Sequence, residues 1–203
     1  MLDRALSLPK AWTNDAARCT GAGIPAARPL ATKPQLAQQM LTRAFDAGVP
    51  ATWGAGDGVY GENRSRRMWL EEHHHAYVLA VSGKAYVWRA GRHQQVKTLL
   101  ATVEAEDWCR LSAGDGTKGP RWYDWTWLPL AAPLQPSWRR WLLVRRSLSD
   151  PTELTAYVVF APEATALDTV VQVAGRRWTI ERCCEEAKGE VGLDQYAVRH
   201  WTG

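Results

Sequence analysis

The middle of this 203-residue chain differs from its two ends in residue composition and segment length. This difference restricts the possible folds more than any other feature of the sequence. From Ser82 to Phe160 the sequence consists of short segments rich in Trp, Tyr and Val, separated by turns that contain Gly, Pro, Asp and Ser. Short segments of this kind, bounded by turn residues, are typical of β-strands. We therefore expect an all-β block over residues 82–160.

The sequence on either side of this block indicates helices and an α/β pattern. Apolar residues recur at helical spacing over positions 36–44, and Gly48 follows as a helix-ending residue. Residues 49–81 then read as a short strand, a glycine-rich turn, a polar helix and an apolar strand. The helical period returns over residues 167–178, although Gly175 could divide that run into two helices. The expected fold class is therefore α/β or α+β.

Composition and charge exclude several classes of protein. No run of about 18 apolar residues is present and the N-terminus lacks a signal-peptide pattern, so we expect a cytoplasmic protein without a membrane partner. The 4 cysteines form no CxxC pair, which favours a reducing compartment and argues against structural zinc. The 12 tryptophans are many for this length, and most must lie in a core or on an aromatic surface.

Three short motifs resemble known sites but lack the spacing that the chemistry needs. In the glycine-rich turn, Val59 stands where a dinucleotide-binding fingerprint has its third glycine. In the run GDGTKG, Thr117 precedes Lys118, whereas a phosphate-binding loop has its hydroxyl residue after the lysine. Three consecutive histidines, residues 73–75, point in different directions on either a helix or a strand. We therefore expect turns and a solvated helix end at these places.

Basic residues are distributed unevenly, although the net charge is only +4. Four arginines flank Trp141 within one short segment, and aromatic rings among basic side chains suit a nucleic acid. The alternative is an ordinary half-buried strand whose long basic side chains reach outward to solvent. The four candidate DNA-binding arginines are Arg139, Arg140, Arg145 and Arg146.

Two carboxylates on different elements are candidates for metal chemistry. Asp57 follows the short strand, and Glu181 lies on the late helix. Hard carboxylate oxygens that converge from separate elements can hold two Mg²⁺ ions for phosphoryl chemistry. On a helix, Arg177, Glu181 and Lys188 return to within roughly 40° of one another. The alternative is a solvated helix face with an ordinary Arg–Glu pair.

The late helix also carries a family resemblance. Residues 177–188 resemble the Tyr-x2-Arg-x3-Glu-x6-Lys signature of bacterial insertion-sequence transposases of the DDE superfamily, whose catalytic domain is ribonuclease H-like. Arg177, Glu181 and Lys188 match this signature, and Ala174 stands in the place of the tyrosine. Further segments resemble successive blocks of one such subgroup, namely residues 8–15, 31–41, 56–61, 77–81, 139–154 and 187–203.

The resemblance implies a partial ribonuclease H-like domain with an all-β insertion. Residues 1–81 would form the first part of the core, residues 82–160 the insertion, and residues 161–203 the helical return. Asp57 would be the second metal-binding aspartate and Glu181 the glutamate, which together help to hold two Mg²⁺ or Mn²⁺ ions. By the same resemblance, Arg177 and Lys188 would face DNA phosphates near the active site.

The implied activity is DNA transposition, by metal-dependent cleavage of element ends and transfer of the freed strand. The family takes its first aspartate from an earlier strand, and neither Asp3 nor Asp15 follows a strand pattern. We therefore expect a fragment that is cut at both ends and inactive in catalysis. The alternatives are a non-catalytic DNA-binding remnant that interferes with an intact transposase, or a product of a decayed gene without a role. The implied partners are DNA, both mobile-element ends and target, and a second copy or an intact transposase in a dimer. The implied location is the nucleoid in the cytoplasm.

Overall fold

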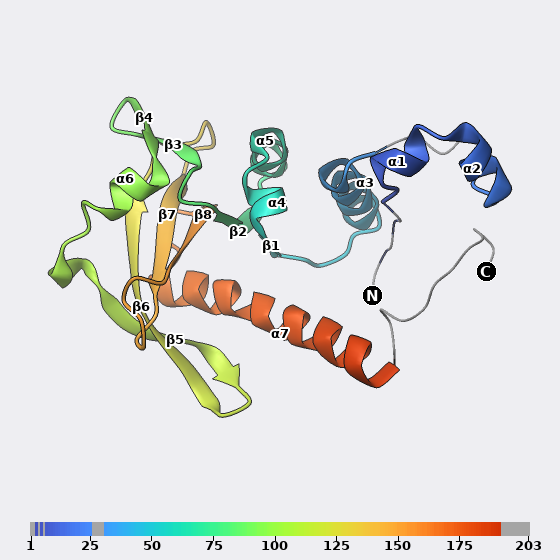
Figure 1. Ribbon diagram of the computed structural model, residues 1–203. Coiled ribbons are helices and arrows are strands. Elements are labelled where there is room, and N and C mark those ends of the chain that lie inside the picture. The colour runs from blue at the N-terminus through green and yellow to red at the C-terminus, as the bar shows by residue number, and fades with distance from the viewer. Residues whose placement is uncertain (1–2, 4, 6, 26–30, 192–203) are drawn as a thin grey trace. The chain divides into compact units, whose positions relative to one another are not determined.

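The computed structural model describes residues 3, 5, 7–25 and 31–191, which divide into two compact units (Figure 1). One unit comprises residues 51–180, and the other comprises residues 1–50 together with residues 181–203. The last block of the transposase resemblance, residues 187–203, lies outside the described residues from position 192 onward.

A six-stranded mixed sheet forms the centre of residues 51–180. Its strand order is β1-β2-β8-β7-β6-β5, in which β1 and β2 are parallel and all other neighbours are antiparallel. Among the described residues, β1 has a strand partner on one side only. The strands are β1 (Trp53–Gly56), β2 (Ala76–Val81), β5 (Cys109–Gly116), β6 (Gly119–Pro129), β7 (Trp138–Arg146) and β8 (Leu154–Pro162).

One face of this sheet packs against the first half of α7 (Leu167–Val191). Because strand side chains alternate between faces, every second residue of β2, β7 and β8 reaches this helix. Val78, Leu143 and Val159 belong to the resulting core together with Val170 and Val171 of α7, and none of these side chains is exposed. This alternation explains why the Trp- and Val-rich block folds as a sheet with a helix on one side.

Short helices and a hairpin accompany the sheet in the same unit. The helices α4 and α5 contact β2, and Tyr77 of β2 turns toward α5 rather than toward α7. A two-stranded sheet, β3-β4, follows β2 in the chain. These elements are α4 (Gly58–Gly61), α5 (Arg64–Glu72), β3 (Tyr86–Arg89), β4 (Arg92–Gln95), α6 (Val96–Leu100) and the 3-10 turn η1 (Ala105–Asp107).

The other unit contains α1 (Lys10–Thr13), α2 (Ala16–Gly21) and α3 (Lys33–Asp46). A capping box starts α3, because the Thr32 side chain accepts the Gln35 N–H while the Gln35 side chain accepts the Thr32 N–H. After α3, Gly48 takes a positive φ of 66°, which glycine adopts at little cost. The predicted helix over residues 36–44 and its glycine stop are both confirmed.

The observed elements confirm most of the expected pattern. Residues 49–81 form the predicted strand, polar helix and strand, with the short helix α4 in the predicted glycine-rich turn. The α+β fold class is consistent with a partial ribonuclease H-like fold. Gly175 does not divide the late helix, because α7 is continuous. The β-rich block also contains α6 and η1, which the sequence did not predict. The division at residues 81 and 160 stays a prediction.

Candidate active site and DNA-binding residues

Asp57 lies at the carboxyl end of β1, where α4 begins. Its Oδ1 accepts a hydrogen bond from the backbone N–H of Val59 at 3.0 Å, so the carboxylate caps the helix. The side chain is half-buried, and Oδ1 is the only oxygen of this carboxylate with a hydrogen bond among the described residues. Carboxyl ends of parallel strands commonly carry functional groups, and Asp57 is placed in that way.

The turn that carries Asp57 is packed tightly onto β2. A Cβ added to Gly61 would lie 1.9 Å from the carbonyl oxygen of Ala80, so only glycine fits there. One residue later, Glu62 accepts the backbone N–H of Ser82 at 3.1 Å, and hydrogen bonding from Ser82 lowers the pKa of Glu62. These contacts hold α4, and with it the backbone next to Asp57, in one position.

The late helix carries the second set of predicted site residues. Arg177, Glu181 and Lys188 all lie within α7, on a helix as the sequence predicted, with Arg177 half-buried and the other two exposed. Asp57 belongs to one compact unit and Glu181 to the other. The approach of their carboxylates to within about 4 to 8 Å, which two shared metal ions would require, therefore stays a prediction.

The four arginines of β7 do not share one face of the sheet. Because side chains alternate along a strand, Arg139 and Arg145 project to the α7 side, and Arg140 and Arg146 project to the other. Arg139 pairs with Glu163 at 2.8 Å. Arg145 bonds the Thr155 hydroxyl and lies 4.5 Å from the Tyr123 ring centre. The structure thus divides the predicted basic cluster into two pairs.

The second pair is also engaged within the protein. Arg146 donates to Asp124 at 3.1 Å, and Arg110 donates to the same carboxylate at 3.0 Å. Burial alone would raise the pKa of Asp124, but these two hydrogen bonds lower the pKa overall. The guanidinium of Arg146 also lies 4.0 Å from the centre of the Trp108 ring. Much of the positive charge on β7 is therefore compensated by neighbouring side chains.

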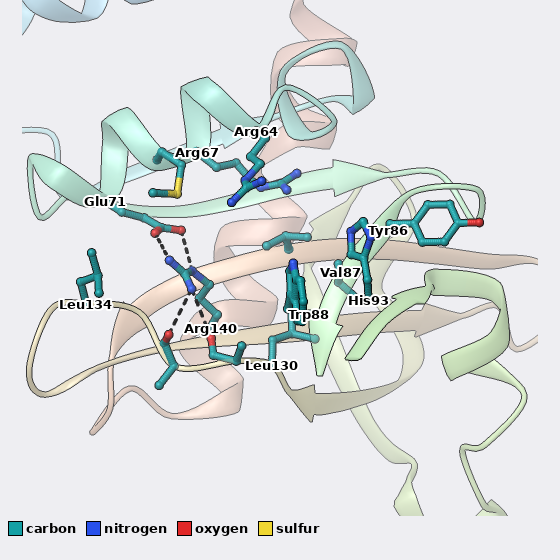
Figure 2. Close-up of a pocket in the computed structure, with 14 residues that line it drawn as sticks. Arg64, Arg67, Glu71, Tyr86, Val87, Trp88, His93, Leu130, Leu134 and Arg140 are labelled. Carbon is teal, nitrogen blue, oxygen red and sulfur yellow. Dashed lines mark hydrogen bonds and ion pairs between the residues drawn. The ribbon is translucent and has the colours of Figure 1, made fainter. Parts of the chain in front are cut away.

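Arg140 forms the most buried ion pair of the unit, with Glu71 of α5 (Figure 2). Its Nε donates to Glu71 Oε1 at 2.9 Å and its Nη2 donates to Oε2, while Tyr77 also donates to Oε1 at 2.7 Å. Hydrogen bonding to Glu71 raises the pKa of Arg140, and burial raises the pKa of Tyr77. Glu71 is only 3% exposed. This cluster ties α5 to two strands of the sheet, and the sequence reading did not predict it.

The three histidines end α5, as expected, but they do not behave alike. His73 and His74 are exposed, whereas His75 is buried directly before β2. Burial lowers the pKa of His75, and the nearby charge of His73 lowers it further. The expectation of a fully solvated helix end is therefore wrong for His75. Within the part of the chain that the structure describes, no group of three or more His, Cys, Asp or Glu side chains could hold a metal ion.

The first part of the chain matches a known protein family. Residues 1–99, which include Asp57, match the family described as DDE superfamily endonuclease. This match supports a DDE-superfamily, transposase-like protein, as the sequence motifs predicted, and it suggests a transposase-like nuclease function that acts on DNA. The late-helix signature lies beyond the matched residues. A comparison with curated proteins found no match. Among the described helices, none combines the length and apolar character that a membrane span needs.

Proposed function

We propose that this chain contributes Asp57 and Glu181 to a two-metal site for DNA cleavage and strand transfer, as in DNA transposition. The observation that carries the proposal is the place of Asp57, at the carboxyl end of β1 and within the residues that match the DDE superfamily. Carboxylate oxygens suit Mg²⁺ or Mn²⁺, and the Asp57 oxygen that does not cap α4 fits such a ligand. When two such ions are bound, they stabilise the attacking and leaving oxygens of phosphoryl transfer.

The chain by itself is expected to bind DNA without cutting it. The family site uses three carboxylates, and the two early aspartates have other roles in this structure. Asp3 pairs with Arg43 at 2.7 Å, and Asp15 caps α2 by accepting the Arg18 N–H at 2.9 Å. Neither follows a strand, so neither resembles a first metal-binding aspartate. A DNA-binding protein of this kind could interfere with an intact transposase, by occupying nucleoid DNA or by forming a mixed dimer.

The exposed Lys188 of α7 is a better candidate for DNA contact than the paired arginines of β7, and the half-buried Arg177 lies on the same helix. Lys188 is exposed, whereas Arg139, Arg140 and Arg146 are already paired with carboxylates. We therefore propose that Arg177 and Lys188 contact DNA phosphates. The β7 arginines would attract DNA only at longer range, through the electrostatic potential of the unit that contains them. Phosphate contacts of this kind give affinities of roughly 10⁻⁴ to 10⁻⁶ M at physiological salt.

Binding and cleavage should be measured on the same purified sample. We expect weak, salt-dependent binding to duplex DNA, and no nicking of supercoiled plasmid in Mg²⁺ or Mn²⁺. Lys188→Ala should reduce the salt slope of binding by about one, whereas the exposed turn variant Lys118→Ala should leave it unchanged. Salt-insensitive binding, or no binding at all, would contradict the DNA-binding proposal.

Nicking by the wild-type protein would contradict the proposal that the chain by itself does not cut DNA. In that case, two variants show whether Asp57 belongs to the active site. Asp57→Asn keeps the helix cap, because asparagine also caps well, but removes the charge that a metal requires. Loss of even an outer residue of a metal site costs about 10- to 100-fold, so this variant should lose at least that much activity. Asp46→Asn, at the exposed end of α3, is the matched control.

A further inference from the structure

A cavity of about 250 Å³ lies on the face of the sheet opposite α7 (Figure 2). Three separate segments of the same compact unit wall it, namely α5, the β3-β4 hairpin and the loop of residues 130–134 that follows β6. Its floor includes Arg140 and Val158, from the second face of β7 and β8. The volume lies just below the range of about 300 to 1,000 Å³ for small-molecule pockets, so the cavity suits one flat group.

The wall formed by α5 is positively charged. Glu71 also lines the cavity, but its carboxylate is already bound by Arg140 and by the Tyr77 hydroxyl. Arg64 and Arg67 therefore add positive charge that the pair does not cancel. Arg67 donates one N–H to the carbonyl oxygen of Gly61. Arg64 is exposed and has no hydrogen bond or ion pair among the described residues. This wall can bind an anion.

The opposite wall, on the β3-β4 hairpin, is aromatic. Trp88 is paired with His93 across the hairpin, and Tyr86 lies two residues before Trp88, so all three rings share one face. The ring centres of Trp88 and His93 are 5.5 Å apart at an interplanar angle of 25°. Tyr86 remains 53% exposed and Trp88 50% exposed. These rings offer flat apolar surface on which a further ring can stack.

We propose that this cavity binds one nucleotide of an unpaired DNA strand, with the base stacked against Trp88 and a neighbouring phosphate held by Arg64 and Arg67. Figure 2 shows both arginines on α5, across the cavity from the hairpin rings. Aromatic faces and cations side by side are the combination by which proteins bind single strands. The choice of DNA as the source of the nucleotide rests on the proposed function, whereas the base-and-phosphate chemistry does not.

Duplex DNA does not fit this cavity. The faces of its bases are covered by the neighbouring bases in the stack, so a ring such as Trp88 cannot reach a base face. A cavity of about 250 Å³ leaves room for a single base rather than a pair. An unpaired strand also presents one phosphate beside each base. This matches a cavity with one aromatic wall and one basic wall. The expected preference is therefore for single-stranded over duplex DNA.

The test is fluorescence anisotropy of a labelled oligothymidylate of about 12 nucleotides, measured with the full chain. Trp88→Ala should weaken binding roughly 5- to 150-fold, because that is the range for losing one stacked base. Trp88→Phe keeps a ring and should retain most of the affinity. Arg64→Ala removes one phosphate contact and should lower the salt slope by about 0.7. Trp122→Ala is the control, since Trp122 is 51% exposed on β6 and does not line the cavity.

Several results would overturn the proposal. It fails if Trp88→Ala and Arg64→Ala bind the oligonucleotide like the wild-type protein, or if Trp122→Ala weakens binding as much as Trp88→Ala. Equal affinity for a duplex of the same length contradicts it as well. If free thymidine monophosphate displaces the oligonucleotide at the same concentration of nucleotides, the ligand of the cavity is a free nucleotide and not a DNA strand. Because none of these readouts needs metal or cleavage, they can fail or succeed independently of the Asp57 site.

Discussion

Glu71→Ala should lower the free energy of unfolding by roughly 3 to 5 kcal/mol, the range for removing one partner of a buried ion pair. Glu71 is 3% exposed and accepts hydrogen bonds from both Arg140 and Tyr77. Without its carboxylate, the Tyr77 hydroxyl loses its acceptor in the interior of the protein. Arg140 keeps only its contacts to the carbonyl oxygens of Ala131 and Ala132, each at 3.3 Å. An uncompensated charge and an unpaired hydroxyl therefore remain.

Urea unfolding of Glu71→Ala and Glu72→Ala gives the comparison that isolates this effect. The two glutamates are neighbours at the end of α5, but Glu72 is exposed. Surface substitutions usually change stability by no more than about 0.5 kcal/mol, so Glu72→Ala should unfold close to the wild-type midpoint. Equal midpoints for the two variants would show that the buried pair adds nothing to stability.

Gly175→Ala should lower the free energy of unfolding by roughly 2 to 3 kcal/mol, although alanine is the better helix former by about 1 kcal/mol. A Cβ at this position would lie 1.9 Å from the carbonyl oxygen of Ala113 and 2.7 Å from its carbonyl carbon. Ala113 lies where the β5–β6 pairing is irregular, but its backbone atoms still cannot move aside as the end of a flexible side chain can. The helix α7 would therefore have to move away from β5, and its packing on the sheet would loosen.

The same movement would disturb a polar contact that joins helix and sheet. Arg121 of β6 donates to the carbonyl oxygens of both Ala113 and Gly175, and its guanidinium lies 4.7 Å from the Trp178 ring centre. Gly189→Ala is the matched control, because it lies on the same helix with nothing within 4 Å of an added Cβ. The free energy of unfolding of this control variant should rise by up to about 1 kcal/mol. Thermal unfolding of both variants checks the prediction, which is wrong if Gly175→Ala melts at or above the wild-type temperature.

Local patterns made the individual elements and the place of Asp57 predictable. The capping residue Thr32, the helical spacing over residues 36–44 and Gly48 all act within a few positions of one another. The turn after β1 is equally local, so the sequence placed Asp57 correctly after a strand, although it did not predict the short helix α4 that Asp57 caps. The alignment of Arg177 with Lys188 required only that α7 be a helix.

Contacts between distant segments were not predictable in the same way. Glu71 and Arg140 lie 69 positions apart, and their pairing depends on the sheet order, which periodicity does not specify. The cavity likewise needs α5, a hairpin and a loop to meet. Gly175 suggested a break because glycine weakens helices, yet here it permits close packing on Ala113. The closeness of the β7 arginines in sequence suggested one basic cluster. Once the segment is recognised as a strand, the alternation of side chains is enough to place them on two opposite faces.

The central proposal is that Asp57 and Glu181 hold the same metal ions, and metal-directed cleavage of the protein backbone tests it most directly. Fe²⁺ that replaces Mg²⁺ generates hydroxyl radicals at its binding site when ascorbate and peroxide are added, and mass spectrometry then locates the cut positions. We predict cuts beside both Asp57 and Glu181, which excess Mg²⁺ suppresses and which either Asp57→Asn or Glu181→Gln removes at both positions. The exposed variant Glu185→Gln, one turn further along α7, should leave them unchanged. Cuts at only one of the two carboxylates, or at neither, would contradict the shared site.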